Sequence, residues 1–504
     1  MTPLLLAVLL AAPPPLHFEG DVTAGDGDYT LVPFSVPAGT AEIQIDHTDG
    51  SDAVILDWGM WAPEGFRGWG GGLVDPAIIG VDAPSRGYLP GPIAAGTWTL
   101  VIGEAKLAAG AGHYSVDVTF RDAPTLTPVP RAAFAPRVLA PGPAWFKGDF
   151  HVHDEESGDA RATFAQIIDL ARSRGLDFVE LSDHNTVSQQ GRQAAAQEGL
   201  TDLLLIRGIE VTTYAGHGNA LGASSYVDHR VGIGGVGAAR IVEAVAAQGG
   251  LFIVNHPTLD IGDLCIGCAW KLPDTPWAKV AGLEIQTGSY LVTGILFTPR
   301  AIAMWDALED QGYRLAAIGG SDDHTAGIDE GPTGSPIGSP TTLVRADELS
   351  EAAIVAAVKA RRTVVLLRGP DDPRLEIAVR GANGAAVGIG DTASGISSIQ
   401  VDAHVVGAAP GDGVSLSIVR DGKPADQVPV DSADFRKSFT YAARGGPERV
   451  RAELIADGAR IVVTSHVYVD GATGGGGCAV GDGGCGWLAV AIAAAFVVRR
   501  RARH

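Results

Sequence analysis

Five segments in the middle of the sequence contain histidines, and four of them also contain acidic residues. They are KGDFHVHDEESGDA with His151, His153 and Asp159, FVELSDHN with Asp183 and His184, GIEVTTYAGHGNALG with Glu210 and His217, LFIVNHP with His256, and LAAIGGSDDH with Asp322 and His324. Imidazoles and carboxylates are the usual ligands of zinc, manganese and iron. Together these side chains outnumber the ligands of a single ion, so the sequence predicts a centre with more than one metal.

No one of these segments establishes a metal site. A lone histidine after a strand is usually a hydrogen-bonded structural residue. Five segments that each place a histidine or an acid beside an apolar stretch are hard to obtain by chance. We therefore expect the five segments to act together in one site.

The segments lie in a region where predicted strands and helices alternate. Residues 163–175 and 239–250 have helical patterns, whereas 177–184 and 251–257 read as buried strands. This alternation predicts parallel βα units in an α/β domain over residues 145–370. Because the carboxyl ends of parallel strands converge on one face, residues far apart in sequence can meet there.

The flanking regions have a different pattern. Residues 16–122 contain short alternating segments such as YTLVPFSV and GTWTLVIG between Gly, Asp and Pro turns, which predict a jelly-roll-like β-sandwich. A Pro-rich linker follows at 123–144. Residues 371–470 alternate again, in segments such as LEIAVRG and VSLSIVRDG, and predict a second sandwich of immunoglobulin size.

Both termini contain apolar runs. Residues 1–15 read as a signal peptide, although a buried strand remains an alternative. Residues 471–504 contain a Gly-rich linker, Cys478, Cys485, an apolar segment and terminal arginines. This order resembles the MYXO-CTERM sorting signal, with an ordinary tail anchor as the alternative. We expect export and anchoring through the tail at the cell surface or outer membrane, with later release left open.

Composition narrows the range of partners. The 504 residues carry a formal charge of −21 and no basic stretch, so a nucleic-acid partner is not expected. The hydrophobic content of 46% is that of a folded globular protein. Cys265 and Cys268 form a CxxC without a second pair nearby, which favours a short-loop disulfide or free thiols over zinc.

The order of the motifs, HxH, DH, E with H, HP and GSDxH, resembles the PHP (polymerase and histidinol phosphatase) superfamily. KGDFHVH, GHGNALG and GGSDDH are most similar to its CehA/McbA-like branch. The resemblance covers roughly residues 145 to 367. It implies a distorted (β/α)7 barrel, flanked here by the two sandwiches, with two or three divalent ions of manganese, zinc or iron.

The resemblance also implies roles for individual residues. Ligands around a bridging position would be His151, His153, Glu210, His256 and Asp322, and the remaining sites would use His184, His217 and His324. Asp159 corresponds to the acid of the family's SDG turn, but the order here is SGDA. Asp183, which would orient a ligand or move a proton, and His217 and His324 are the candidate catalytic residues.

The expected activity is that of a metal-dependent hydrolase, most simply a phosphoesterase that attacks a small or extracellular phosphate ester with a metal-activated hydroxide. Lys147, Arg207 and Arg300 could contact the substrate, or could be ordinary surface cations.

Two alternatives stay open. The same centre could cleave a carbamate or carboxylic ester, which an aromatic pocket would favour, or the chain could be a non-catalytic, metal-stabilised surface binding protein. The aromatic candidates for such a pocket are Trp270, Trp277 and Trp305, although core positions are expected for them.

Overall fold

A computed structural model describes residues 14–48, 53–108, 110–262, 265–328, 334–381, 384–409 and 411–471. Most of the predicted signal peptide (residues 1–13) and of the predicted tail (472–504, with Cys478 and Cys485) lies outside the described residues. Both therefore stay predictions. In the described part of the chain, no helix is long and apolar enough to cross a membrane.

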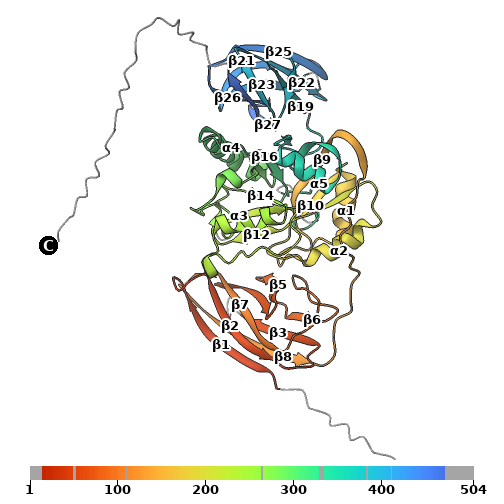
Figure 1. The fold of residues 1–504 in the computed structure, drawn as a ribbon, viewed down its shortest axis with the longest axis vertical. Coiled ribbons are helices and arrows are strands. Elements are labelled where there is room, and N and C mark those ends of the chain that lie inside the picture. Colours follow the sequence, from red (N-terminus) through yellow and green to blue (C-terminus); the bar gives the residue numbers. More distant parts are fainter. Residues whose placement is uncertain are drawn as a thin grey trace, which may run out of the picture. The chain divides into compact units, whose positions relative to one another are not determined.

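The N-terminal region forms two antiparallel four-stranded sheets (Figure 1). One sheet has the order β1 (Leu16–Thr23), β8 (Ala111–Arg121), β3 (Glu42–Thr48), β6 (Ala77–Gly80), and the other has the order β2 (Tyr29–Val36), β7 (Gly96–Leu107), β4 (Val54–Ala62), β5 (Gly65–Gly71). Alternate side chains of the strands point inward, and the core between the sheets includes Ile43, Ile45, Met60 and Trp98. The predicted flanking β-sheet region is confirmed.

The central region is mixed α/β, as predicted. Its strands are β9 (Ala140–Val152), β10 (Phe178–Leu181), β11 (Leu204–Arg207), β12 (Glu210–Thr213), β13 (Gly216–Leu221), β14 (Leu251–Val254), β15 (Gly282–Thr287), β16 (Ala316–Gly320), β17 (Thr341–Leu349) and β18 (Thr363–Leu366). Its α-helices are α1 (Phe164–Ser173), α2 (Ser188–Gln197), α3 (Ala238–Ala247), α4 (Ile295–Asp310) and α5 (Glu351–Lys359).

Local sequence explains the helices that cover these strands. Thr163 and Gln166 form a capping box that starts α1, and Phe164, Ile167 and Ala171 place one buried stripe along it. Ile241 and Val245 form the same kind of stripe on α3, which packs against an apolar cluster of the central strands. Each of these two helices is thus held by an apolar face.

The central strands belong to two sheets, so the predicted (β/α)7 barrel is not confirmed. One contains β11-β10-β9-β17-β18 and the other β12-β13-β14-β15-β16. Pairings within β9–β11 and within β14–β16 are parallel, whereas β17 runs antiparallel to β9, and β13 to β12 and β14. Two isolated bridges, Val152 to Asp323 and His184 to Glu210, join the sheets next to the histidine segments.

The C-terminal region again consists of sheets whose pairings are antiparallel, except that β21 (Thr392–Ile396) pairs in parallel with β28 (Val467–Gly471). One has the order β20 (Ala386–Gly388), β19 (Arg374–Arg380), β22 (Ser398–Val406), β25 (Asp434–Ala442), and the facing strands are β27 (Ala459–Thr464), β26 (Pro447–Ala456), β23 (Ser415–Arg420) and β24 (Lys423–Pro429), with β28 and β21 beside them. Because β18 pairs with β27, this second sheet continues the central one.

Candidate metal centre

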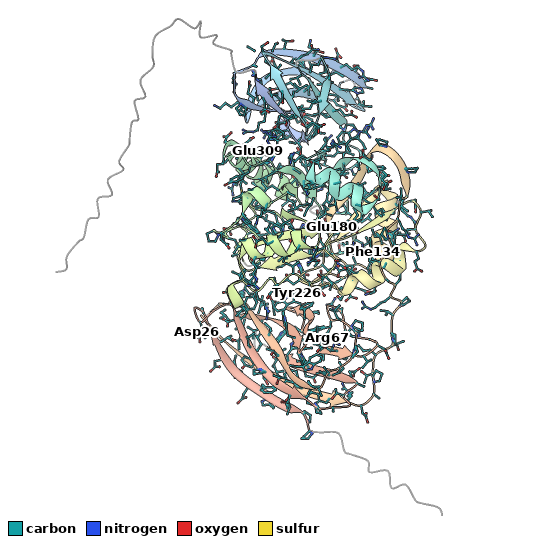
Figure 2. All side chains as sticks on the ribbon, in the orientation of Figure 1. Asp26, Arg67, Phe134, Glu180, Tyr226 and Glu309 are labelled. Carbon is teal, nitrogen blue, oxygen red and sulfur yellow. A yellow bond between two sulfur atoms is a disulfide. The ribbon has the colours of Figure 1, made fainter. Side chains whose placement is uncertain are left out.

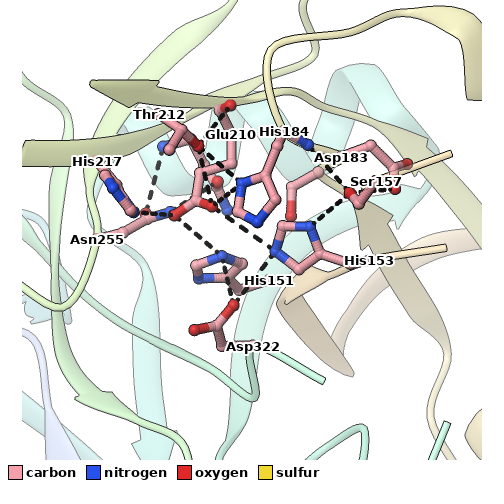
Figure 3. Close-up of polar contacts among 12 residues, drawn as sticks. His151, His153, Ser157, Asp183, His184, Glu210, Thr212, His217, Asn255 and Asp322 are labelled. Atoms are coloured by element: carbon pink, nitrogen blue, oxygen red, sulfur yellow. Dashed lines mark hydrogen bonds and ion pairs between the residues drawn. The ribbon is translucent and has the colours of Figure 1, made fainter. Parts of the chain in front are cut away.

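The ends of the central strands bring the histidine segments together (Figure 3). His151 is the penultimate residue of β9, and Asp183 follows β10. His256 comes two residues after β14, and Asp322 comes two residues after β16. Glu210 opens β12 and His217 lies opposite Thr212 on the neighbouring β13. The convergence expected from the strand ends is therefore present.

Four of these residues form a buried group around a common point. His151 Nε2 lies 3.2 Å from both Glu210 Oε1 and Asp322 Oδ1, and His153 Nε2 lies 3.2 Å from the same Asp322 oxygen. His151 Nε2, His153 Nε2 and Asp322 Oδ1 are buried and make no hydrogen bond within the described chain. Buried polar atoms are rarely left unpaired. Ligand atoms that face one another without hydrogen bonds fit a divalent cation at this position.

The charges in this group suit metal binding. Burial raises the pKa of Glu210, but the charges of His151 and His217 outweigh it and hold that pKa well below its ordinary value. Burial lowers the pKa of His153 to about 3, with His324 and His184 acting in the same direction. The anionic Glu210 and the neutral His153 are in the protonation states that metal ligands require. Burial lowers the pKa of His151, but the carboxylates of Asp322 and Glu210 outweigh it and hold that pKa well above its ordinary value, so His151 would release a proton when a metal binds.

A second group lies beside the first. His184 Nε2 and His324 Nε2 are 3.4 Å apart, and each lies 3.5 Å from Asp159 Oδ1. His153 shares this group with His184 and His324. Asp159, whose position in SGDA departs from the family motif, is therefore brought to the cluster.

A third group contains His217 and His256, both near Glu210 Oε1 at 3.5 and 3.2 Å. Cys268 lies within reach of the two histidines, but the structure joins it to Cys265 in a disulfide. The loop acts through its backbone instead: His217 Nε2 contacts the carbonyl of Ile266 at 3.1 Å, and His256 Nδ1 that of Cys268 at 3.3 Å. The CxxC loop thus orients two candidate ligands.

Glu284 is a functional residue that the sequence reasoning missed. It lies fully buried on β15, and its Oε1 is 3.0 Å from His151 Nδ1. Its Oε2 accepts hydrogen bonds from the amide of His256 and the hydroxyl of Thr287. A carboxylate on the far nitrogen of a ligand imidazole fixes the ring. The available signal was an acid inside the apolar strand GLEIQT.

Asp183 lies behind the cluster rather than in the cavity. Ser157 Oγ donates a hydrogen bond of 2.8 Å to Asp183 Oδ1 and lies 3.0 Å from His153 Nδ1. Burial raises the pKa of Asp183 to about 7. Asp183 therefore reaches His153 only through Ser157, and its predicted role, to orient a ligand or move a proton, stays a prediction. Ser157 was not singled out from the sequence.

Two candidate ligands have strained backbones. His256 has φ 24° and Asp322 has φ 58°, in the left-handed region that side chains other than glycine rarely adopt. Such strain persists only where the surrounding structure enforces it, and it concentrates at functional sites. Gly320 leaves the space for this packing, because a Cβ there would collide with the His151 side chain.

A cavity of about 550 Å³ opens onto the cluster. Its lining includes the candidate ligands Asp159, His184, Glu210, His217, His256, Asp322 and His324. The remaining wall contains Ile55, Asp57 and Trp69 from the N-terminal sandwich, which the sequence reasoning did not connect to the site.

The structure does not bring the predicted substrate-binding cations to this cavity. Lys147 Nζ donates to the carbonyl of Pro370, Arg207 pairs with Glu351, and Arg300 lies over the ring of Phe297. No lysine or arginine is among the described residues that line the cavity.

The three tryptophans considered for an aromatic pocket do not line the cavity either. Trp305 is buried in the core, and Trp270 and Trp277 pack at its edge.

Comparisons with known proteins find only remote similarity. No protein-family profile matches the sequence, and no curated protein matches it. Among solved structures the chain is similar to "a putative metal-dependent phosphoesterase" from Bifidobacterium adolescentis, with 15% identity and a TM-score of 0.26 over 37% of this chain and 92% of the other.

Two further structures are similar at the same remote level. A mitogen from Yersinia pseudotuberculosis has 16% identity and a TM-score of 0.14 over 23% of this chain and 100% of the other. A β-glucuronidase from Bacteroides uniformis has 10% identity and a TM-score of 0.17 over 90% of this chain and 60% of the other. Scores of this size support no argument, so the site stands on its own geometry.

Proposed function

We propose that the chain is a metal-dependent hydrolase, in the first place a phosphoesterase. The observation that carries this proposal is the meeting of His151 Nε2, His153 Nε2 and Asp322 Oδ1 beside Glu210. These three atoms are buried and make no hydrogen bond among the described residues. The PHP-like order of the motifs and the two bridges between the central sheets support a distorted barrel around this cluster.

The proposed ligands are His151, His153, Asp159, His184, Glu210, His217, His256, Asp322 and His324, which fall into adjoining groups suited to two or three ions of manganese, zinc or iron. Divalent ions held there would lower the pKa of a water molecule to near neutrality and would offset charge on the ester oxygens.

The chain's own residues orient the proposed ligands. Glu284 holds the ring of His151, and Ser157 with Asp183 holds that of His153. The side chain of Asp159 is 64% exposed and borders the cavity, so this proposed ligand meets the cluster from its solvent side. In the reaction, the oxygen of water forms a bond to phosphorus, the P–O bond to the alcohol breaks, and the alcohol leaves with a proton.

The cavity wall favours some esters over others. Because no Lys or Arg is among the described lining residues, only metal ions and histidines would offset the phosphate charge. This favours a phosphodiester, with one negative charge, over a monoester with two. The apolar wall of Ile55, Trp69 and Ile266 supports a carbamate or carboxylic ester as the second candidate.

We further propose that the chain is exported and held at the cell surface or outer membrane by its C-terminal tail. The Cys265–Cys268 disulfide supports this, since disulfides persist mainly in oxidising compartments. Expression with and without residues 472–504, followed by fractionation, tests the anchor: the shortened chain is expected in the soluble fraction. Equal membrane content of both chains would refute anchoring by the tail.

Hydrolysis assays test the activity. Purified protein supplied with Mn²⁺, Zn²⁺ or Fe²⁺ is given bis-p-nitrophenyl phosphate, p-nitrophenyl phosphate and 1-naphthyl N-methylcarbamate. We expect the diester to be cleaved fastest, and His151→Ala to lose at least about a thousandfold in kcat/KM. Faster cleavage of the carbamate would establish the second candidate, and no turnover on any ester would leave a metal-stabilised binding protein.

A further inference from the structure

The N-terminal sandwich supplies one wall of the metal cavity. Ile55 and Asp57 come from β4, Trp69 from β5 and Ala105 from β7, and all four line the cavity together with the candidate ligands. Cavity walls made of two domains are common places for substrate recognition. The sandwich is therefore part of the site and not a separate appendage.

Specific contacts fix this wall against the central strands. Tyr214, directly after β12, donates a hydrogen bond of 2.7 Å from its hydroxyl to Asp57 Oδ2 and stacks on Tyr29. A Cβ at Gly103 would collide with the Tyr214 hydroxyl, so glycine is needed at that position on β7.

A second contact lies nearby, where Tyr226 stacks on Phe66 with ring centroids 3.7 Å apart. Tyr226 is labelled in Figure 2.

Asp57 has one carboxylate oxygen left for a ligand. Its Oδ2 accepts from Tyr214, whereas its Oδ1 has no hydrogen-bond partner in the described chain and borders the cavity. Burial raises the pKa of Asp57 to about 6, so the side chain is mostly anionic at neutral pH. No arginine or lysine among the described lining residues offsets this charge.

An anion held in such a wall selects the opposite charge in a ligand. A carboxylate binds an ammonium group through charge-assisted hydrogen bonds, and neighbouring aromatic rings strengthen the binding of a cation. Trp69 and Tyr214 are the aromatic residues that line the cavity with Asp57. An additional anionic group would instead be repelled by Asp57.

We propose that Asp57, with Trp69 and Tyr214, forms a subsite for an ammonium group on the alcohol of a phosphodiester. This inference rests on the proposed phosphoesterase function and adds the substrate class: a zwitterionic ester, with its phosphate at the metal cluster and its ammonium at the sandwich wall. The sandwich then determines specificity, while the central domain supplies the chemistry.

A matched pair of substrates tests the subsite on the full-length, metal-loaded protein. 2-Aminoethyl 4-nitrophenyl phosphate and propyl 4-nitrophenyl phosphate share their leaving group and nearly their shape, but only the first carries an ammonium. We expect kcat/KM to favour the aminoethyl ester about tenfold, and Asp57→Asn to bring the ratio close to one. Asp122→Asn, an exposed aspartate of the same sandwich, should keep the wild-type ratio.

A wild-type ratio near one, or a ratio that survives Asp57→Asn, overturns the subsite while the phosphoesterase stands. The wild-type ratio of kcat/KM for the two esters tests the ammonium subsite even if the Asp57 variant does not fold.

Binding without turnover gives a second, independent readout. Saturation-transfer NMR on metal-free, full-length protein compares ethanolamine with 1-propanol as probes. A signal for ethanolamine that Asp57→Asn removes and Asp122→Asn keeps supports the subsite, and equal signals for both probes contradict it. If neither ester is hydrolysed, the proposed activity fails, and this measurement still decides whether the wall binds ammonium.

Discussion

The central domain borders two cavities of similar size whose polar groups differ. One, of about 470 Å³, lies among residues 133–138, α2, β11 and α5, and the other, of about 550 Å³, opens on the histidine cluster. In the first, Arg207 is paired with Glu351 at 2.6 Å and lies over the ring of Phe134 at 3.5 Å. In the second, Asp322 Oδ1 faces two histidine nitrogens without a hydrogen bond.

The difference shows that cavity size does not identify a functional site. A paired arginine and glutamate have already satisfied one another, and their contact stabilises the fold. Buried ligand atoms that point at one another are stable only if something binds between them. The predictions below test this contrast between the Arg207 cavity and the histidine cavity.

The largest effect is expected from the carboxylate at the centre of the cluster. Glu210→Gln removes a charge that faces His151, His184 and His256, so kcat/KM should fall by at least about a thousandfold and metal content should drop. Glu351→Gln at the first cavity is the matched control and should retain turnover. Equal losses in both variants would remove the distinction between the two cavities.

A smaller effect is expected for Glu284, which contacts the candidate ligand His151. Glu284→Gln keeps the shape of the side chain but weakens its hold on His151 Nδ1, so metal affinity should fall about 10- to 100-fold. Titration with a fluorescent metal chelator measures this, with Glu243→Gln on the surface of α3 as the control. Unchanged affinity would mean that Glu284 has only a packing role.

At the first cavity, stability should change and activity should not. Arg207→Met breaks the contact with Glu351, and we expect the free energy of unfolding to fall by about 1 to 3 kcal/mol. Denaturant unfolding and ester hydrolysis are measured together, with Arg240→Met as an exposed control. A loss of turnover in the folded variant would return Arg207 to the substrate-binding role considered from the sequence.

The smallest effect concerns the wall that the sandwich adds to the second cavity. His229 packs against Trp69, and burial lowers the pKa of His229 to about 3. The unfolded chain binds a proton below about pH 6.5, whereas the folded chain does not until about pH 3. Stability is therefore lost as pH falls between these values. His229→Gln should flatten this dependence in pH-resolved thermal unfolding.

The exposed His113→Gln is the matched control, a histidine substitution away from the cavity wall, and its acid slope is compared with that of His229→Gln. An identical slope for wild type and His229→Gln would show that His229 is not kept neutral by burial.

The periodic parts of the sequence predicted local structure well. The helical pattern over 163–175 corresponds to α1, and the apolar stretch over 177–184 contains β10. The histidine segments could be found because each follows or begins a strand, and chain order alone brings strand ends together.

The missing parts of the site depend on contacts that no local pattern shows. Glu284 has the sequence context of an ordinary strand residue. Asp57 and Trp69 lie about 80 residues or more before the nearest histidine segment and reach the cavity only because the sandwich docks through Tyr214. Arg207 has the residue type of a phosphate binder, and only its contact with Glu351 shows a structural role. Nor did spacing decide between one closed barrel and two bridged sheets.

Metal content measured on the protein itself tests the central claim most directly. The full-length chain is stripped with a chelator, reloaded, and analysed by elemental mass spectrometry beside His151→Ala. We predict two or more ions per wild-type chain and a loss of at least one in the variant, since His151 contacts both Glu210 and Asp322. A wild-type chain that retains no metal, or a variant that retains the full number, would contradict the metal centre.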